Sequence, residues 1–368
     1  MRAFVFSTVL LTMACGGSRT GGAIEPAAEG DPVARCEAGE TSACLEAGRA
    51  FDTGDGVERD PERAQALYGR ACDGGEARAC TALGTRFFPG RDGEMDPARA
   101  RTLFETGCEG GDPIGCYDLA VLLASGVEGG QADLPRAKTL FERACDGDVF
   151  AACNNLGLLV RAEGEEARAI SLFTRGCEGG SASACHNLAL ALERQGDEHL
   201  RRVRELLERA CESGIGASCA HLGAIYEDGR GVTADASRAR AIYERACDAE
   251  RPEPCVSLGA LYAEGRGVEV DYARAHGFYE QACNAGDMRG CVALGSLYST
   301  ARGVEQDHVR AAELFTRACE ASEPRGCFNL AASHASGLGV PQDRARARTL
   351  FARACSLGME EACRIVGE

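Results

Sequence analysis

The sequence has no tryptophan, a single lysine and no long apolar run beyond its first residues. Aromatic residues make up only 6% of the 368 residues, so we expect the core to be built from leucine, alanine and isolated rings. Lysine occurs once, at Lys138, among 40 lysines and arginines. A membrane-spanning helix needs about 20 apolar residues, and no such run follows residue 14. We therefore expect the remainder of the chain to be soluble.

The balance of charge is strongly acidic. The formal net charge is −16, which argues against binding to nucleic acid or to an anionic membrane surface. Cationic partners are favoured, although a solvated acidic surface explains the same charge.

Cysteine, in contrast, is abundant and regularly spaced. Twenty of the 21 cysteines form ten Cys-x7-Cys pairs, which begin 32 to 37 residues apart. A fixed period of this size is typical of stacked-repeat proteins, which present extended binding surfaces. Structural zinc sites favour Cys-x2–4-Cys spacing, so we expect disulfides and no metal. The predicted bonds are Cys36–Cys44, Cys72–Cys80, Cys108–Cys116, Cys145–Cys153, Cys177–Cys185, Cys211–Cys219, Cys247–Cys255, Cys283–Cys291, Cys319–Cys327 and Cys355–Cys363.

The spacing within each pair requires the chain to reverse direction. Eight residues of straight helix separate two Cα atoms by ~12 Å, whereas a disulfide needs roughly 4.4–6.8 Å. In seven pairs a glycine stands three residues after the first cysteine, where it can end a helix in a left-handed conformation. Asp148, Glu250 and Ser322 hold this position in the other three. Each pair is thus predicted to clasp a helical hairpin.

The first 33 residues predict export. Met1-Arg2, an apolar stretch from residue 3 to 13 and Ala14 have the order of a secretory signal. Leu11-Thr12-Met13-Ala14-Cys15 resembles a bacterial lipobox, although Thr12 departs from the usual leucine. We expect a signal peptide at 1–14, a lipid on Cys15 with a flexible tether at 15–33, and an anchor in the outer membrane. An ordinary signal, giving a periplasmic or secreted protein, is the alternative.

Each period predicts two helices joined by a turn. From Cys219, apolar residues recur at helical spacing until Gly229-Arg230-Gly231-Val232 interrupts them, and Asp235 then caps a second helix. Asp60, Asp96, Asp271, Asp307 and Asp343 hold the same cap position. A leucine and then glycine or alanine follow eight of the ten second cysteines, and an aromatic ring or leucine stands four residues before nine of the ten first cysteines. We expect these positions to form the core.

The consensus Cys-x-x-Leu-Gly-x-x-Tyr-x-x-Gly-x-Gly-Val-x-x-Asp-x-x-Arg-Ala…Ala-Cys resembles the Sel1-like repeat, and the Cys-x7-Cys variety resembles the Hcp-type cysteine-rich secreted proteins. The resemblance covers residues 36–368. It implies an all-α fold, a right-handed α-solenoid of about nine helix–turn–helix repeats at 34–368, clasped by disulfides and with the first helices on the concave face. Two stretches, 159–167 and 192–196, lack the turn and shorten their repeats by four and two residues, so we expect irregular geometry there.

The resemblance also implies two kinds of function. Family members mostly act as adaptors, while some Hcp-type proteins carry a β-lactamase or penicillin-binding label. A serine lactamase needs Ser-x-x-Lys and Lys-Thr-Gly, and both are missing around Lys138. The six histidines form no metal-binding pair, and no phosphate-binding or dinucleotide motif is present. We therefore expect no cofactor and no enzyme activity.

Two residues after each second cysteine, seven of nine positions are polar. These residues would line the first-helix face as a stripe, and amide side chains can pair with an extended peptide. We predict a scaffold or adaptor of the envelope that binds a protein or peptide. A purely structural envelope lipoprotein with a solvated inner face is the alternative. The predicted contact residues are Glu46, Asp118, Asn154, Asn155, Asn187, His221, Ser257 and Asn329.

Overall fold

The computed structural model describes residues 30–88, 95–126, 132–248 and 251–367, and these residues form helices joined by turns. The predicted signal peptide and Cys15 lie outside the described residues. Along the chain the helices are α1 (Pro32–Glu37), α2 (Thr41–Thr53), α3 (Pro61–Asp73), α4 (Ala77–Gly84), α5 (Pro97–Glu109), α6 (Pro113–Ser125), α7 (Leu134–Asp146), α8 (Phe150–Ala162), α9 (Glu166–Glu178), α10 (Ala182–Glu193), the 3₁₀ helix η1 (Asp197–His199), α11 (Leu200–Glu212), α12 (Gly216–Asp228), α13 (Ala236–Ala246), α14 (Pro252–Glu264), α15 (Tyr272–Asn284), α16 (Met288–Thr300), α17 (His308–Glu320), α18 (Pro324–Ser336), α19 (Arg344–Ser356) and α20 (Glu360–Gly367).

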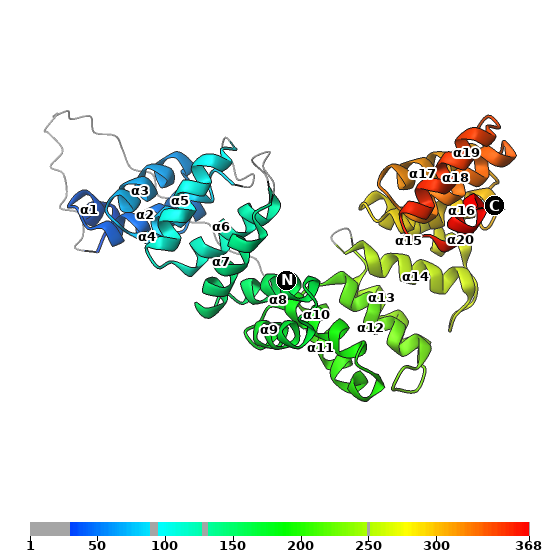
Figure 1. Ribbon diagram of the computed structural model, residues 1–368, viewed down its shortest axis with the longest axis horizontal. Coiled ribbons are helices and arrows are strands. Elements are labelled where there is room, and N and C mark those ends of the chain that lie inside the picture. The colour runs from blue at the N-terminus through cyan, green and yellow to red at the C-terminus, as the bar shows by residue number, and fades with distance from the viewer. Residues whose placement is uncertain (1–29, 89–94, 127–131, 249–250, 368) are drawn as a thin grey trace, which may run out of the picture.

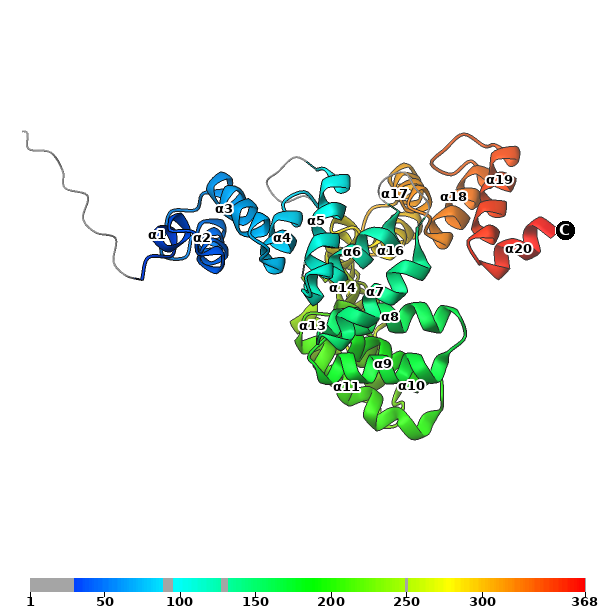
Figure 2. The same cartoon turned by 60° about the vertical axis from the view of Figure 1, so that its left-hand side comes forward.

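The helices form an α-solenoid, as predicted. Within the described ranges nine antiparallel pairs run from α2/α3 to α18/α19, with single helices α1 and α20 at the ends. Figure 1 shows them following one another in chain order from α1, through α8–α12 at the bottom of the view, to α20. In the rotated view of Figure 2, α1 and α20 remain at opposite ends. The tether was predicted to extend to residue 33, but α1 already begins at Pro32.

Seven of the nine second helices begin at an aspartate cap, which is one of the six predicted aspartates in every case except Asp133 before α7, whereas α9 and α11 follow Glu165 and His199, whose side chains form no cap hydrogen bond. The aspartate carboxylate accepts a hydrogen bond from the backbone NH three residues later, for example 3.0 Å from Arg63 to Asp60, which satisfies one of the unpaired donors of the first turn. The arginine that donates this NH also stacks on the aromatic ring at the end of the first helix. Arg238 lies 4.2 Å from the ring centre of Tyr226, and equivalent pairs are Arg63/Phe51, Arg99/Phe87, Arg274/Tyr262 and Arg310/Tyr298.

The core confirms the predicted register. A Cβ built at Gly223 would lie 2.1 Å from the Tyr243 ring, so only a very small residue allows the two helices of a repeat to approach this closely. Gly48, Gly84, Gly157, Gly259 and Gly295 meet the equivalent ring in their own repeats. The predicted leucines are all buried, and so is each ring except Phe351, which is half-buried near the last helix.

All ten predicted disulfides are present, and each joins the second helix of one repeat to the first helix of the next. The Cα atoms lie between 4.3 and 4.8 Å apart. The residue three positions after the first cysteine has positive φ in every described pair, including Asp148 (63°) and Ser322 (67°), so the left-handed turn forms even without glycine. The other seven such residues are glycines, and Glu250 lies outside the described residues.

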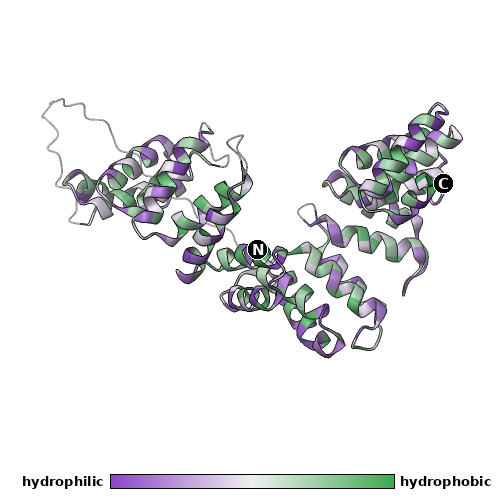
Figure 3. Ribbon diagram, viewed as in Figure 1, coloured by the Kyte–Doolittle hydropathy of each residue, from purple (hydrophilic) through white to green (hydrophobic). Residues whose placement is uncertain are grey.

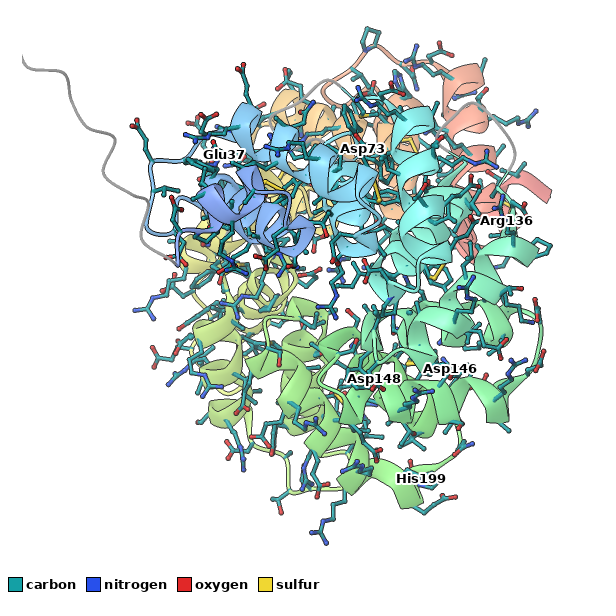
Figure 4. The ribbon with its side chains drawn as sticks, turned by 90° about the vertical axis from the view of Figure 1, so that its left-hand side faces the viewer. Glu37, Asp73, Arg136, Asp146, Asp148 and His199 are labelled. Carbon is teal, nitrogen blue, oxygen red and sulfur yellow. A yellow bond between two sulfur atoms is a disulfide. The ribbon has the colours of Figure 1, made fainter. Side chains whose placement is uncertain are left out.

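A second set of contacts between repeats was not predicted. The arginine two residues before a first cysteine donates to the carbonyl of the cysteine one repeat earlier, as Arg143 does to Cys108 at 3.1 Å. Arg70, Arg209 and Arg317 do the same with Cys36, Cys177 and Cys283. In Figure 4 the labelled Asp146 and Asp148 lie close together near the end of α7, where Arg175 of the next repeat binds both.

The two shortened repeats differ in their turns, as expected. Residues 163–165 alone connect α8 to α9, whereas residues 229–235 connect α12 to α13. Hydrophilic and hydrophobic residues alternate along the helices (Figure 3), and no described helix is long and apolar enough to cross a membrane.

Candidate functional site

Five of the eight pairs of successive first helices pack closely against each other. Helices α4 and α6, α8 and α10, α12 and α14, α14 and α16, and α16 and α18 pack directly against one another. In the described ranges the second helices of successive repeats approach each other less closely than these pairs do. The first helices therefore line the shorter, inner side of the curved stack, and we call their solvent-facing side the first-helix surface.

The eight predicted contact residues all lie on first helices. Glu46 is exposed on α2, and six residues are half-buried on α6 to α18: Asp118, Asn155, Asn187, His221, Ser257 and Asn329. Asn154 is the exception, because only 6% of it is exposed. The Asn154 side chain therefore has little surface left for contact with a partner.

Three of the predicted amides meet in one chain of hydrogen bonds. The Asn187 Nδ2 group donates to Asn154 Oδ1 at 2.8 Å, and Asn154 Nδ2 donates to Asn155 Oδ1 at 3.2 Å. The buried Asn154 thus connects α8 to α10, because both atoms of its amide group are used within the protein. An amide offers two donors and two acceptor sites, so Asn155 and Asn187 retain capacity to bind another molecule.

Two histidines extend this polar cluster onto α12. His186 Nδ1 lies 2.8 Å from Ser218 Oγ, and His221 Nε2 lies 3.0 Å from Glu193 Oε1. Burial, followed by the nearby His221, lowers the pKa of His186. His186 and Ser218 were not predicted. Their sequence signal is position, since His186 directly follows the second cysteine of its pair, as Asn154 does.

Asp118 lies on the neighbouring helix α6 without a partner. No described residue forms a hydrogen bond or ion pair with its carboxylate, although the side chain is half-buried. Burial raises the pKa of Asp118 to about 6, and the negative charge of Asp112 adds to this effect. Next to it, burial and then Asp118 raise the pKa of Tyr117, which a hydrogen bond from Asn155 opposes. These residues continue the polar cluster from α10 and α8 to α6.

The other predicted residues lie apart from this central cluster. Glu46 is paired with Arg35 at 3.4 Å near the start of the described chain. Ser257 and Asn329 lie on α14 and α18, where the first-helix surface becomes partly apolar. A hollow of about 720 Å³ in this region is lined by Val256, Ala260, Val292, Ala293 and Met359 among others, and the sequence stripe did not reveal it.

The arrangement gives no sign of a catalytic or metal site. No group of three or more His, Cys, Asp or Glu side chains could hold a metal ion within the part of the chain that the structure describes. The serine that meets a histidine, Ser218, is fully buried, so its hydroxyl cannot reach a substrate carbonyl. The cluster is suited to hydrogen bonding with a bound molecule.

Comparison with known proteins places these features in a family. The family model described as Sel1 repeat matches residues 41–76, 77–112, 113–149, 216–250, 255–287, 289–323 and 324–359. The two shortened repeats, α8 to α11, fall in the gap between these matches. No curated protein matches the sequence.

Several solved structures are similar to this chain. A protective antigen present in uropathogenic Escherichia coli strains, with an SLR fold, is 24% identical with a TM-score of 0.61, and the match covers 91% of this chain and 73% of that one. A Sel1 repeat protein from Oxalobacter formigenes is 21% identical over 91% of this chain and 89% of that chain, with a TM-score of 0.46. Cysteine-rich protein B of Helicobacter pylori is 28% identical over 35% of this chain and 92% of that chain, with a TM-score of 0.30.

Proposed function

Because the chain belongs to the Sel1 repeat family, whose solenoids are typically non-enzymatic, we propose that it is a scaffold that binds a segment of a partner protein on its first-helix surface. One observation carries this proposal. The packing positions repeat along the chain, while the neighbouring surface positions change from repeat to repeat.

Two positions of the first helix differ in how much they vary from repeat to repeat. The position four residues after the second cysteine is glycine or alanine throughout, because it lies against a ring or a helix. Two residues earlier on the same helices the side chains are Glu46, Ala82, Asp118, Asn155, Asn187, His221, Ser257, Ala293 and Asn329. Stacking alone does not require this variety. A surface with different chemistry at each step is suited to recognising an extended segment.

The central cluster supports a peptide as the bound segment. Asn155 and Asn187 can each donate and accept, as the NH and CO groups of a peptide backbone require. Asp118 adds an unpaired carboxylate on α6, which favours a partner with a basic side chain nearby. The formal charge of −16 favours the same kind of partner.

The disulfides support a location outside the reducing cytosol. Ten disulfides within the described residues require an oxidising compartment to form and persist, so we infer an exported protein. We also propose that Cys15 is acylated and anchors the chain to the outer membrane. Mass spectrometry of the mature N-terminus tests this: an unmodified Cys15, or cleavage elsewhere, contradicts it.

The double variant Asn155→Ala/Asn187→Ala tests the binding surface. Each lost hydrogen bond costs about 1 kcal/mol, so we expect a partner captured from envelope extract to bind at least tenfold more weakly. Since Asn187 is bonded to the buried Asn154, the variant also loses about 1–3 kcal/mol of stability. If both amides were fully exposed, the double variant would keep the stability of the original protein; because Asn187 is bonded to Asn154, we expect a loss.

Two controls separate binding from stability. Asn154→Ala breaks the same chain of hydrogen bonds beneath the surface, so it should reduce stability similarly while affinity changes less than threefold. Gln195→Ala/Asn284→Ala removes two exposed amides elsewhere and should change neither quantity. Unchanged affinity in the Asn155→Ala/Asn187→Ala variant would leave the surface without a binding role.

A further inference from the structure

Two kinds of bond recur between successive second helices, and both are formed at the α5/α7 and α15/α17 joints. In the first, the arginine three residues after the aspartate or glutamate cap pairs with a glutamate three residues before the cysteine of the preceding repeat. In the second, the arginine two residues before a cysteine donates to the preceding cysteine carbonyl. The first kind is formed by Arg136–Glu105 at 2.8 Å, Arg168–Glu142 at 2.8 Å and Arg310–Glu280 at 3.9 Å, and the second by Arg143, Arg209 and Arg317 at 2.9–3.1 Å.

At the joint between α11 and α13 both bonds are open. The required residues are all present, because Arg238 corresponds to Arg136, Glu208 to Glu105, and Arg245 to Arg143. Among the described residues, however, Arg238 does not pair with Glu208 and Arg245 does not reach the Cys211 carbonyl. Two adjoining clefts of about 420 and 180 Å³ lie between the helices instead, and Glu208, Tyr226 and Arg238 line both.

The end of α13 accounts for part of this opening. Each of the other second helices ends one residue after its cysteine. Helix α13, in contrast, already ends at Ala246, and the backbone of Cys247 is extended (φ −73°, ψ 106°). Arg245 therefore lies in the last turn of α13. Arg245 and Cys211 both line the smaller cleft.

The first-helix side of the same joint is closed by polar contacts. Glu193 at the end of α10 contacts His221 at 3.0 Å and Arg230 at 2.5 Å, both from the next repeat. Between the two sides, α11 packs on α12 and the Cys211–Cys219 disulfide fixes their contact. The joint thus has contacts formed on one side and complementary groups held apart on the other.

We propose that the α11/α13 joint is a hinge with two states. In the state seen here Glu193 holds the first-helix side. In the second state Arg238 pairs with Glu208 and Arg245 donates to the Cys211 carbonyl, as their counterparts do elsewhere, while the contacts of Glu193 loosen. The contacts of Glu193 are half-buried, whereas Glu208 and Arg238 are exposed, and ion pairs that water still reaches are each worth only about 0–1 kcal/mol, so we expect both states to be populated.

This hinge would change the first-helix surface where the central cluster lies. His221 and Glu193 belong to the hinge, and Asn187 is on the same helix α10 as Glu193. A molecule that binds this surface in one state shifts the joint towards that state. The hinge itself is a property of the free protein and does not depend on the proposed partner.

Distances across the joint test the hinge. Nitroxide labels attached to p-acetylphenylalanine at Glu212 and Ala241, both exposed, report the α11–α13 distance by pulsed double electron–electron resonance. The matched control pair is Asn284 and Glu313, at the corresponding positions of α15 and α17, where both bonds are formed. We expect two distance populations at the first pair and one at the control.

Three variants assign the populations. Glu208→Gln removes the ion pair of the second state, so the shorter distance should fall at least threefold in population. Glu193→Gln weakens the first state, so the population of the shorter distance should rise by a similar factor. Arg230→Gln should change this population in the same direction. Circular dichroism confirms that each variant is folded. A single population at the α11/α13 pair, or two populations that all three variants leave unchanged, contradicts the hinge.

Discussion

Replacing Asp118 with asparagine should make the protein more stable at neutral pH. The carboxylate is half-buried on α6 without a hydrogen bond or ion pair from any described residue, and burial raises its pKa from the ordinary 3.8 to about 6. The folded protein therefore holds a proton on Asp118 more tightly than the unfolded chain does. As pH rises from about 4 to 6 this proton is lost, and the folded state loses stability with it.

The size of the effect follows from the pKa. Each pKa unit corresponds to ~1.4 kcal/mol, so a rise from 3.8 to about 6 corresponds to roughly 3 kcal/mol. Because the side chain is partly solvated and asparagine also has to be desolvated, we expect a net gain of about 1–2 kcal/mol above pH 7. Below pH 4 the gain should vanish, since Asp118 is then neutral in both states.

Guanidinium unfolding at pH 4, 5, 6 and 7.5, together with hydrogen exchange of the α6 amides, measures this gain where it arises. Exchange is needed because repeat proteins can open locally. The control Asp55→Asn removes an exposed carboxylate from the connection between α2 and α3, and it should leave the dependence of stability on pH unchanged. A loss of stability in Asp118→Asn at pH 7.5, or a gain that is equal at pH 4, would refute the reasoning.

Three further predictions concern the framework. A Cβ at Gly339 would lie 1.9 Å from a backbone oxygen of α17, whereas one at Gly56 would meet nothing within 4 Å, so Gly339→Ala should lower the midpoint of thermal unfolding clearly more than Gly56→Ala, although φ is positive at both. Replacing Cys145 and Cys153 by serine should cost at most about 2.5 kcal/mol, since the loop is short, and hydrogen exchange should increase in α7 and α8 while α16 stays unchanged. Leu258→Ala should cost about 2–5 kcal/mol by the same unfolding assay, because this side chain is fully buried.

Most of the fold could be predicted because each repeat contains residues that mark where its helices begin and end. The aspartate caps, the residue after each cysteine that takes positive φ, and the paired leucine and small residue are local signals with local physical causes. Their repetition made them reliable. Asp148 and Ser322 show that the turn is imposed by the hairpin and its disulfide, since neither residue has the freedom of glycine.

The site was harder to predict because burial depends on how repeats pack against each other. Asn154 and Asn155 are adjacent in sequence, yet one residue of helix turns a side chain by about 100°, and only Asn154 faces the neighbouring helix α10. Likewise, Arg238 and Glu208 have the same residue types as pairs that bind elsewhere, but they do not pair with each other. Neither outcome is encoded in the spacing of residues within a single repeat.

Photo-crosslinking tests most directly whether the first-helix surface binds a partner. p-Benzoylphenylalanine is placed at Glu46, Ala260 or Ala332 on first helices, and at Ala241, Glu313 or Arg348 on second helices, in the full-length exported protein. If the proposal is correct, irradiation of intact cells gives adducts with the same partner from at least two of the first-helix positions and none from the second-helix positions. Adducts that form only from second helices, or equally from both sets, would contradict it.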